Sequence, residues 1–248
     1  MKADLEDALV PVKWAEAQIP ILQQRLIEWN RSGPYRIFVE PDPQQPNWEL
    51  LIAKLEKPLD PLIIGDVGAV INSVRTALNL LIAAVVARHG TIPSRAPDFP
   101  IAKKPADFLA AVEKLKTEHG LTAVEAKIIE RTKAYSDVFP GGDHLIWHIG
   151  KLDNLRKHQR LIHVEPIPTE VNLTQIYMVQ RIMEHSHAQN KTKLYRIPNG
   201  SFHATKGNTN LTAEIFLNET ATGIGVRPAV VGLRVYCSRV RSFILSFP

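Results

Sequence analysis

The 248-residue chain has a single cysteine, Cys237. One thiol cannot form a disulfide within the chain, and it cannot supply a cysteine-based zinc site, which uses two or more thiolates. The sequence therefore excludes a fold held together by its own disulfides, and it argues against a zinc-binding module.

Long hydrophobic runs are also absent. The longest, Leu80 to Ala87, is far shorter than the roughly 20 residues that a bilayer-spanning helix needs. The N-terminal residues, Met1 to Asp7, are charged and lack the apolar stretch of a signal peptide. We therefore expect a cytoplasmic protein that is not inserted in a membrane.

The common phosphate-binding and hydrolase motifs are missing. The sequence contains neither G-x-x-x-x-G-K-[ST] nor G-x-G-x-x-G, and it has no G-x-S-x-G. The segment Gly223 to Gly225 indicates only a turn. These absences argue against the usual nucleotide-binding and α/β-hydrolase classes, and we expect no cofactor.

The composition is that of an ordinary globular protein, with 45% hydrophobic and 22% charged residues. The length is enough for one large domain or two small ones. The formal net charge of +5 and the sequence pI of about 9.3 are compatible with an anionic partner. They do not require one, because 25 acidic residues are mixed in and no long basic run occurs.

Helical periodicity dominates the first two thirds of the chain. Residues 61 to 88 form the longest predicted helix, and it is apolar almost all round, as is typical of a helix buried by its neighbours. Residues 35 to 55 fit a short β-hairpin. Residues 4 to 30 predict a first helix with a kink at Pro20. The apolar residues of this first helix are Leu5, Leu9, Val12, Ala15, Ile19, Leu22 and Ile27.

Three more helices are predicted before residue 163. One covers residues 105 to 118. A capping-box pattern, Thr122 to Glu125, opens the next, which we expect to reach about Ala134. The third follows Asp143 as N-cap and runs to Ile162.

The amino-acid composition changes after Pro168, where glycine, asparagine and threonine become more frequent. Residues 230 to 247 favour a final helix, although a strand fits their second half almost as well. Alternating β-branched residues predict a meander of strands at Gln175–Ile182, Lys193–Ile197, Phe202–Thr205 and Leu211–Leu217.

The predicted fold class is therefore α+β. We expect a helical core in residues 1 to 165, built around the helix 61 to 88 and including the hairpin at 35 to 55. A β-rich part follows in residues 166 to 248 and ends in the possible helix. The alternative that the two parts form one domain stays open.

Three polar residues interrupt the apolar helix 61 to 88. Asn72, Arg75 and Asn79 are three and four residues apart, so they lie on one side of the helix. A buried arginine needs a partner, because desolvating its charge costs several kcal/mol. The first interpretation is a structural arginine that ties helices together. The second is a polar patch that faces a cleft or a dimer interface.

The helix after Asp143 carries a basic edge. His158 lies opposite the apolar side, with Asn154 one turn before it, and Arg156, Lys157 and Arg160 surround it. These cations can hold a phosphate, and a histidine beside them should lose its proton more easily, as suits a general base. The alternative is an ordinary solvated basic face.

The other histidines give weaker evidence. His144 and His148 have the spacing of metal ligands on a helix, but no H-E-x-x-H pattern surrounds them. His185 and His187 fall in an expected loop. We predict no metal site.

Three segments carry a family resemblance: Ser73 to Leu80 (SVRTALNL), Phe99 to Ile101 (FPI) and Arg156 to Arg160 (RKHQR). Their order and approximate spacing, across residues 35 to 163, resemble a family of uncharacterised bacterial proteins. Its members carry an Asn-Leu-Arg-Ser-Ala-Leu-Asp-His helix, a Phe-Pro-Ile segment and a Lys-His-Arg helix. The resemblance implies a bacterial origin.

The first motif of that family is similar to the R-x4-6-H signature of HEPN domains. These are all-helical modules, many of them dimeric ribonucleases in which Arg and His cut RNA at a shared interface. Arg75 matches the signature, but Leu80 stands where the histidine is expected, Asn79 replaces the aspartate, and Ser73 replaces the asparagine. The resemblance thus implies a degenerate site, unless His158 substitutes as the base.

Two functional hypotheses follow. The first is a HEPN-like protein that binds RNA or another anionic ligand, or that is a weak or inactive ribonuclease. Such a protein could form a homodimer. The second is a non-enzymatic interaction or small-ligand-binding protein with a structural arginine. Steep weakening of binding by salt would favour the first. In the first, Arg75 and His158 form a tentative catalytic pair, and the binding residues are Asn72, Asn79, Asn154, Arg156, Lys157 and Arg160.

Overall fold

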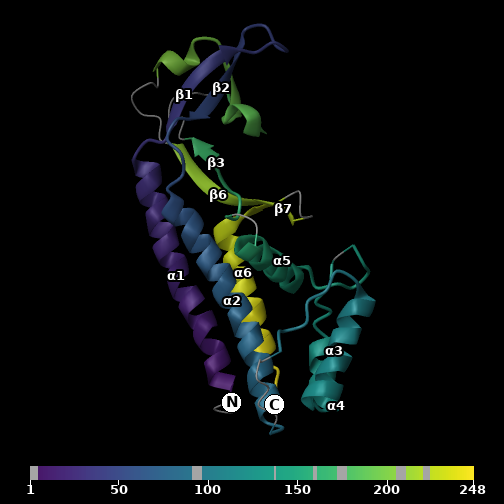
Figure 1. Cartoon of the computed structure of the whole chain (residues 1–248). Helices are drawn as coiled ribbons and strands as arrows, with labels where there is room; N and C mark the ends of the chain where they lie inside the picture. The colour runs from purple at the N-terminus through teal and green to yellow at the C-terminus, as the bar shows by residue number, and fades with distance from the viewer. Residues whose placement is uncertain are drawn as a thin grey trace.

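The computed structural model describes residues 5–90, 97–136, 138–158, 161–171, 178–204, 211–219 and 224–248. The fold is α+β, as the sequence predicts, with a helical body below and β-sheets above it in Figure 1. The helices are α1 (Glu6–Arg31), α2 (Pro61–Ala87), α3 (Pro105–His119), α4 (Ala123–Glu130), α5 (His144–His158) and α6 (Ala229–Ile244). The strands are β1 (Tyr35–Pro41), β2 (Trp48–Leu55), β3 (Val164–Val171), β4 (Gln180–Ser186), β5 (Lys191–Pro198), β6 (Leu211–Glu219) and β7 (Ile224–Pro228).

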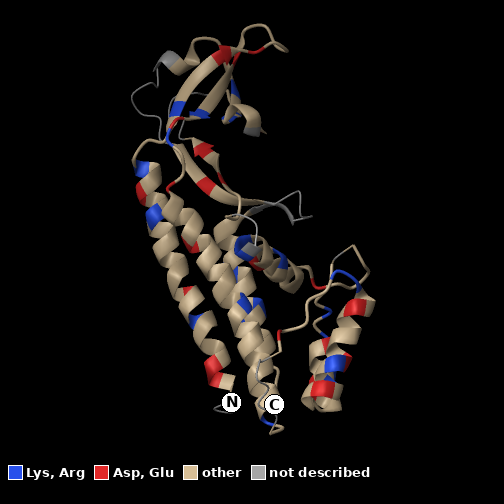
Figure 2. Cartoon of the chain, viewed as in Figure 1, with Lys and Arg blue, Asp and Glu red and all other residues tan. Residues whose placement is uncertain are grey.

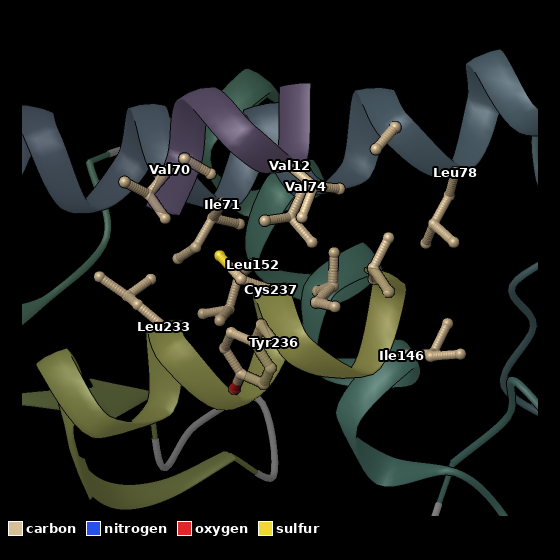
Figure 3. Packing of buried hydrophobic residues seen from close by; sticks show 14 of the residues in the cluster. Val12, Val70, Ile71, Val74, Leu78, Ile146, Leu152, Leu233, Tyr236 and Cys237 are labelled. Carbon is tan, nitrogen blue, oxygen red and sulfur yellow. The ribbon is translucent and has the colours of Figure 1, made fainter. Parts of the chain in front are cut away.

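Helix α2 is the centre of the hydrophobic core. It contacts α1, α5 and α6, which explains why its sequence is apolar almost all round. In Figure 3, Val70 and Ile71 of α2 lie near Leu152 of α5 and Leu233 of α6. By length and composition α2 is also apolar enough to cross a membrane, a test that the core helix of a soluble protein passes as well.

The strands form two antiparallel sheets, ordered β1-β2-β5-β4 and β3-β6-β7. Strand β5 pairs with β2, so the N-terminal hairpin continues into C-terminal strands. Helix α6, at the end of the chain, packs back against α1 and α2. The boundary expected at residue 165 therefore separates segments that contact one another closely.

Several local predictions are confirmed. Asp143 caps α5, since its Oδ1 accepts hydrogen bonds from the backbone amides of Leu145 and Ile146. The capping box of Thr122 and Glu125 opens α4. The C-terminal segment is helical throughout α6, so the strand alternative is wrong.

Other predictions need correction. In α1, the buried residue near the C-terminal end is Leu26 in place of the exposed Ile27, while the kink expected at Pro20 stays a prediction. Helix α4 ends at Glu130, and α5 ends at His158. Both helices are shorter than expected because the apolar pattern continues into the segments that follow them.

The expected meander is also wrong, because its strands are divided between the two sheets. Ser201–Ala204 is a short 3-10 helix where a strand was expected. Residues 175 to 177 and Thr205 lie outside the described part of the chain.

Candidate site on helices α2 and α5

The polar stripe of α2 (Asn72, Arg75 and Asn79) holds a loop segment against the helix. Asn79 accepts a hydrogen bond from the backbone amide of Phe99 at 3.0 Å, and its Nδ2 donates to Asp98 Oδ1 at 2.8 Å. Arg75 Nη2 donates to the carbonyl oxygen of Phe99 at 3.0 Å. Both backbone polar groups of Phe99 are thus satisfied by α2, and the buried Phe99 ring packs edge-on against Phe243.

The surroundings of Arg75 agree with the first interpretation, a structural arginine. Burial lowers the pKa of its guanidinium, and Asp98 and Asp153 partly oppose that shift. Its Nη1 is buried and has no hydrogen-bond partner among the residues that the structure describes. Arg75 is half-buried, and its hydrogen bond to a backbone carbonyl limits the freedom of the guanidinium to meet a ligand.

The rest of the stripe meets α5. Arg156 Nη2 donates to Asn72 Oδ1 at 2.8 Å and lies 3.4 Å from Asp153 Oδ1. The Arg156 side chain crosses α2 above Gly68, where an added Cβ would lie 3.0 Å from Arg156 Cδ. Gly68 therefore provides the space in which Arg156 reaches Asn72.

Asp153 is a central residue that the sequence prediction missed. It is 1% exposed, and its Oδ2 lies 2.6 Å from Lys157 Nζ. The spacing to Arg156 and Lys157, three and four residues, is the standard spacing of ion pairs on a helix and could have indicated it. Asp153 joins the two cations of α5 and contributes to the electrostatic environment of Arg75.

The structure brings only part of the predicted site together. Asn72 and Arg156 touch, whereas Asn154 and Lys157 are exposed to solvent. His158 is the last residue of α5, and its side chain lies outside the described part of the structure, as does Arg160. The predicted pairing of Arg75 with His158 therefore remains a prediction.

A second group of residues forms the outer stripe of α5 (Trp147, Lys151 and Asn154). The three lie four and three residues apart, on one side of the helix. Trp147 and Lys151 are half-buried, and the Lys151 ammonium lies 5.7 Å from the centre of the Trp147 ring. Figure 2 shows cations along α5, whereas α2 beside it is almost uncharged.

The histidines of the two predicted pairs lie in different surroundings. The rings of His144 and His148 are 5.8 Å apart, and His148 is buried. His185 Nε2 lies 2.7 Å from Glu165 Oε1, and its Nδ1 lies 2.7 Å from Thr192 Oγ1, so it links the two sheets. Among the described residues no three potential ligands are grouped closely enough to hold a metal ion.

Comparison of the chain with family models, with curated proteins and with solved structures gives no match. The similarity to HEPN domains therefore rests on the sequence motifs alone. On α2 itself, Leu80 takes the position of the expected histidine and is 38% exposed. The arrangement can position cations and an aromatic ring, but α2 offers no imidazole as a general base.

Proposed function

We propose that the protein binds RNA, or a related polyanion, on the outer stripe of α5 and does not cleave it. The observation that carries this proposal is the placement of Lys151 over Trp147 beside the exposed Asn154. Aromatic rings with neighbouring cations are the usual means by which proteins hold single-stranded nucleic acid, since bases stack on the ring and phosphates meet the charge.

The charge of α5 agrees with this proposal. Lys151, Arg156 and Lys157 provide three cations, and Asp153 provides one buried carboxylate against them. The Lys157 side chain remains 41% exposed while it contacts Asp153. A phosphate can therefore approach Lys157 and Lys151 from solvent.

The absence of a cleavage step in the proposal follows from α2. The family resemblance would place Arg75 and a histidine on this helix as the catalytic pair. Arg75 instead donates to the Phe99 carbonyl, and Leu80 carries no ionisable group. We therefore expect binding without turnover.

Binding should be measured by the fluorescence anisotropy of a labelled single-stranded RNA over a range of salt concentrations. For single strands the logarithm of the affinity falls with the logarithm of salt, with a slope of about −0.7 per neutralised phosphate. Lys151→Gln should reduce that slope by roughly one phosphate's share, and Trp147→Ala should weaken binding about tenfold through lost stacking. Lys127→Gln, an exposed lysine on α4, is the matched control.

A second candidate function is the binding of a small ligand. A cavity of about 540 Å³ lies where the end of α1 meets β1 and β6, and Asn30, Tyr35 and Thr212 are among its lining residues. That volume is within the usual range of ligand pockets, about 300 to 1,000 Å³. Failure of RNA to bind at low salt would contradict the first proposal and favour this one.

A further inference from the structure

Helix α1 has two apolar sides, and in the part of the chain that the structure describes only one of them is packed against other elements. One side, from Leu5 to Trp29, packs into the core. The other side carries Val10, Trp14 and Ile21, which are 57%, 44% and 46% exposed. Single exposed apolar residues are ordinary on protein surfaces, but three large ones on one helix face are not scattered.

The spacing of these residues forms a seam. Val10, Trp14, Ala17 and Ile21 follow each other at intervals of four, three and four residues, and Ala17 is exposed as well. This is the repeat by which one helix packs along another, with the side chains of each filling spaces on its partner. In Figure 1, α1 forms one edge of the helical body.

We propose that this seam binds the same seam of a second copy of the chain, with the two α1 helices antiparallel. A two-fold axis between residues 15 and 16 pairs Val10 with Ile21 of the second copy. It also pairs the large Trp14 with the small Ala17. A two-fold interface must be self-complementary in this way, because the same surface of both copies takes part and every contact occurs twice.

The charges of α1 agree with the antiparallel direction. Glu6 and Asp7 are in its first turn, and Arg31 is in its last. The same axis brings Glu6 next to Arg25 of the second copy. Arg25 also pairs with Asp66 of its own chain but remains 37% exposed. Antiparallel packing therefore places the acidic first turn of each helix near Arg25 of the other, whereas parallel packing would place the two acidic first turns together.

The first test is sedimentation of the full chain over a range of concentrations. We expect a reversible dimer, and we expect Ile21→Glu to weaken it roughly 30-fold. The substitution removes about half of a full side-chain burial at each of the two symmetric contacts. Each of these losses weakens the dimer affinity about fivefold. Val235→Glu on α6 is the matched control, because Val235 is a 40% exposed aliphatic residue outside the seam. It should leave the dimer unchanged.

Mixing two variants tests the direction and register. Ile21→Glu and Val10→Lys should each dimerise poorly alone, and an equal mixture should dimerise better than either. In the mixed dimer the carboxylate introduced at position 21 of one copy meets the ammonium introduced at position 10 of the other. The unmodified Val10 and Ile21 still meet at the symmetric contact. Both substitutions are at exposed positions, so thermal melting should stay as in the unmodified protein.

Three results would overturn the proposal. The chain could remain monomeric at every concentration, the mixture could dimerise no better than the separate variants, or Val235→Glu could break the dimer while Ile21→Glu does not. RNA binding is measured separately, on α5 variants, so failure of one proposal does not decide the other.

Discussion

Helices α2 and α5 both carry polar residues at helical spacing, but the two sets have different roles. The stripe on α2 is half-buried, and its hydrogen bonds go to the Phe99 backbone, to Asp98 and to Arg156. The outer stripe of α5 is exposed at Asn154 and half-buried at Trp147 and Lys151, and within the described part of the chain Lys151 contacts the ring of Trp147 and not another element. The comparison teaches that an arginine motif on a buried helix indicates structure first, and that ligand binding is better sought where cations remain accessible.

The largest effect should come from the carboxylate between the two helices. Asp153→Ala removes the buried carboxylate that Arg156 and Lys157 share. The two cations are 29% and 41% exposed and keep part of their solvation, so we expect a loss of about 2 to 3 kcal/mol in the free energy of unfolding. Urea denaturation measures it. Lys151→Gln, on the outer stripe, should change stability by less than about 0.5 kcal/mol. Equal effects of the two substitutions would remove the distinction between the side of α5 that contacts α2 and its outer stripe.

Arg75→Ala should destabilise the protein by about 2 kcal/mol. The substitution removes the hydrogen bond to Phe99 and leaves that buried carbonyl without its partner. Leu80→Ala, at an exposed position of the same helix, is the control and should have a small effect. If Arg75→Ala melted like the unmodified protein and lost RNA binding, Arg75 would be functional and the account of α2 would be wrong.

Glu125 of α4, which contacts His89 just after α2, makes a pH-dependent contribution to the stability of the fold. Burial alone would raise the pKa of Glu125, but hydrogen bonds from Thr122 and His89 outweigh it and lower the pKa. A carboxyl group with a lowered pKa stabilises the fold above its ordinary value of 4.5, and the contribution is lost as the pH falls below that value. Denaturation midpoints between neutral pH and acid should therefore fall more steeply for the unmodified chain than for Glu125→Gln. Parallel curves would contradict this.

The smallest effects should come from two glycines. Gly65 in α2 has open space around it, so Gly65→Ala should stabilise the protein by up to about 1 kcal/mol through helix propensity. Gly150 in α5 faces Ile101, and an added Cβ would lie 2.7 Å from Ile101 Cδ1. Gly150→Ala should therefore destabilise by about 1 kcal/mol, because Ile101 must move. A gain in stability at Gly150 would show that the loop against α5 is loosely held.

Much of the fold could be predicted because it depends on local patterns. The apolar periodicity of α2, the capping box at Thr122 and the N-cap at Asp143 each determine an element from neighbouring residues. The pairing of β2 with β5 could not be predicted in the same way. It joins segments that are far apart in the sequence, and alternation within a strand carries no information about its partner.

The same limit applies to the candidate site, where local features could be predicted and distant contacts could not. The one-sided placement of Asn72, Arg75 and Asn79 follows from helical spacing, whereas their partners do not. Which segment would cover α2 depended on how the chain folds back at Phe99, which no motif specifies. The role of Asp153 could have been predicted, because its spacing to Lys157 is a local feature of the sequence.

The most direct test of the central claim compares the RNA affinities of Arg75→Lys and Lys151→Gln at low and at physiological salt. Arg75→Lys keeps the charge and a donor near Phe99, so folded protein should bind RNA as the unmodified chain does. Lys151→Gln should bind several-fold more weakly, with a smaller dependence on salt. The reverse result, in which Arg75→Lys abolishes binding and Lys151→Gln has no effect, would place the functional site on α2 and contradict the account.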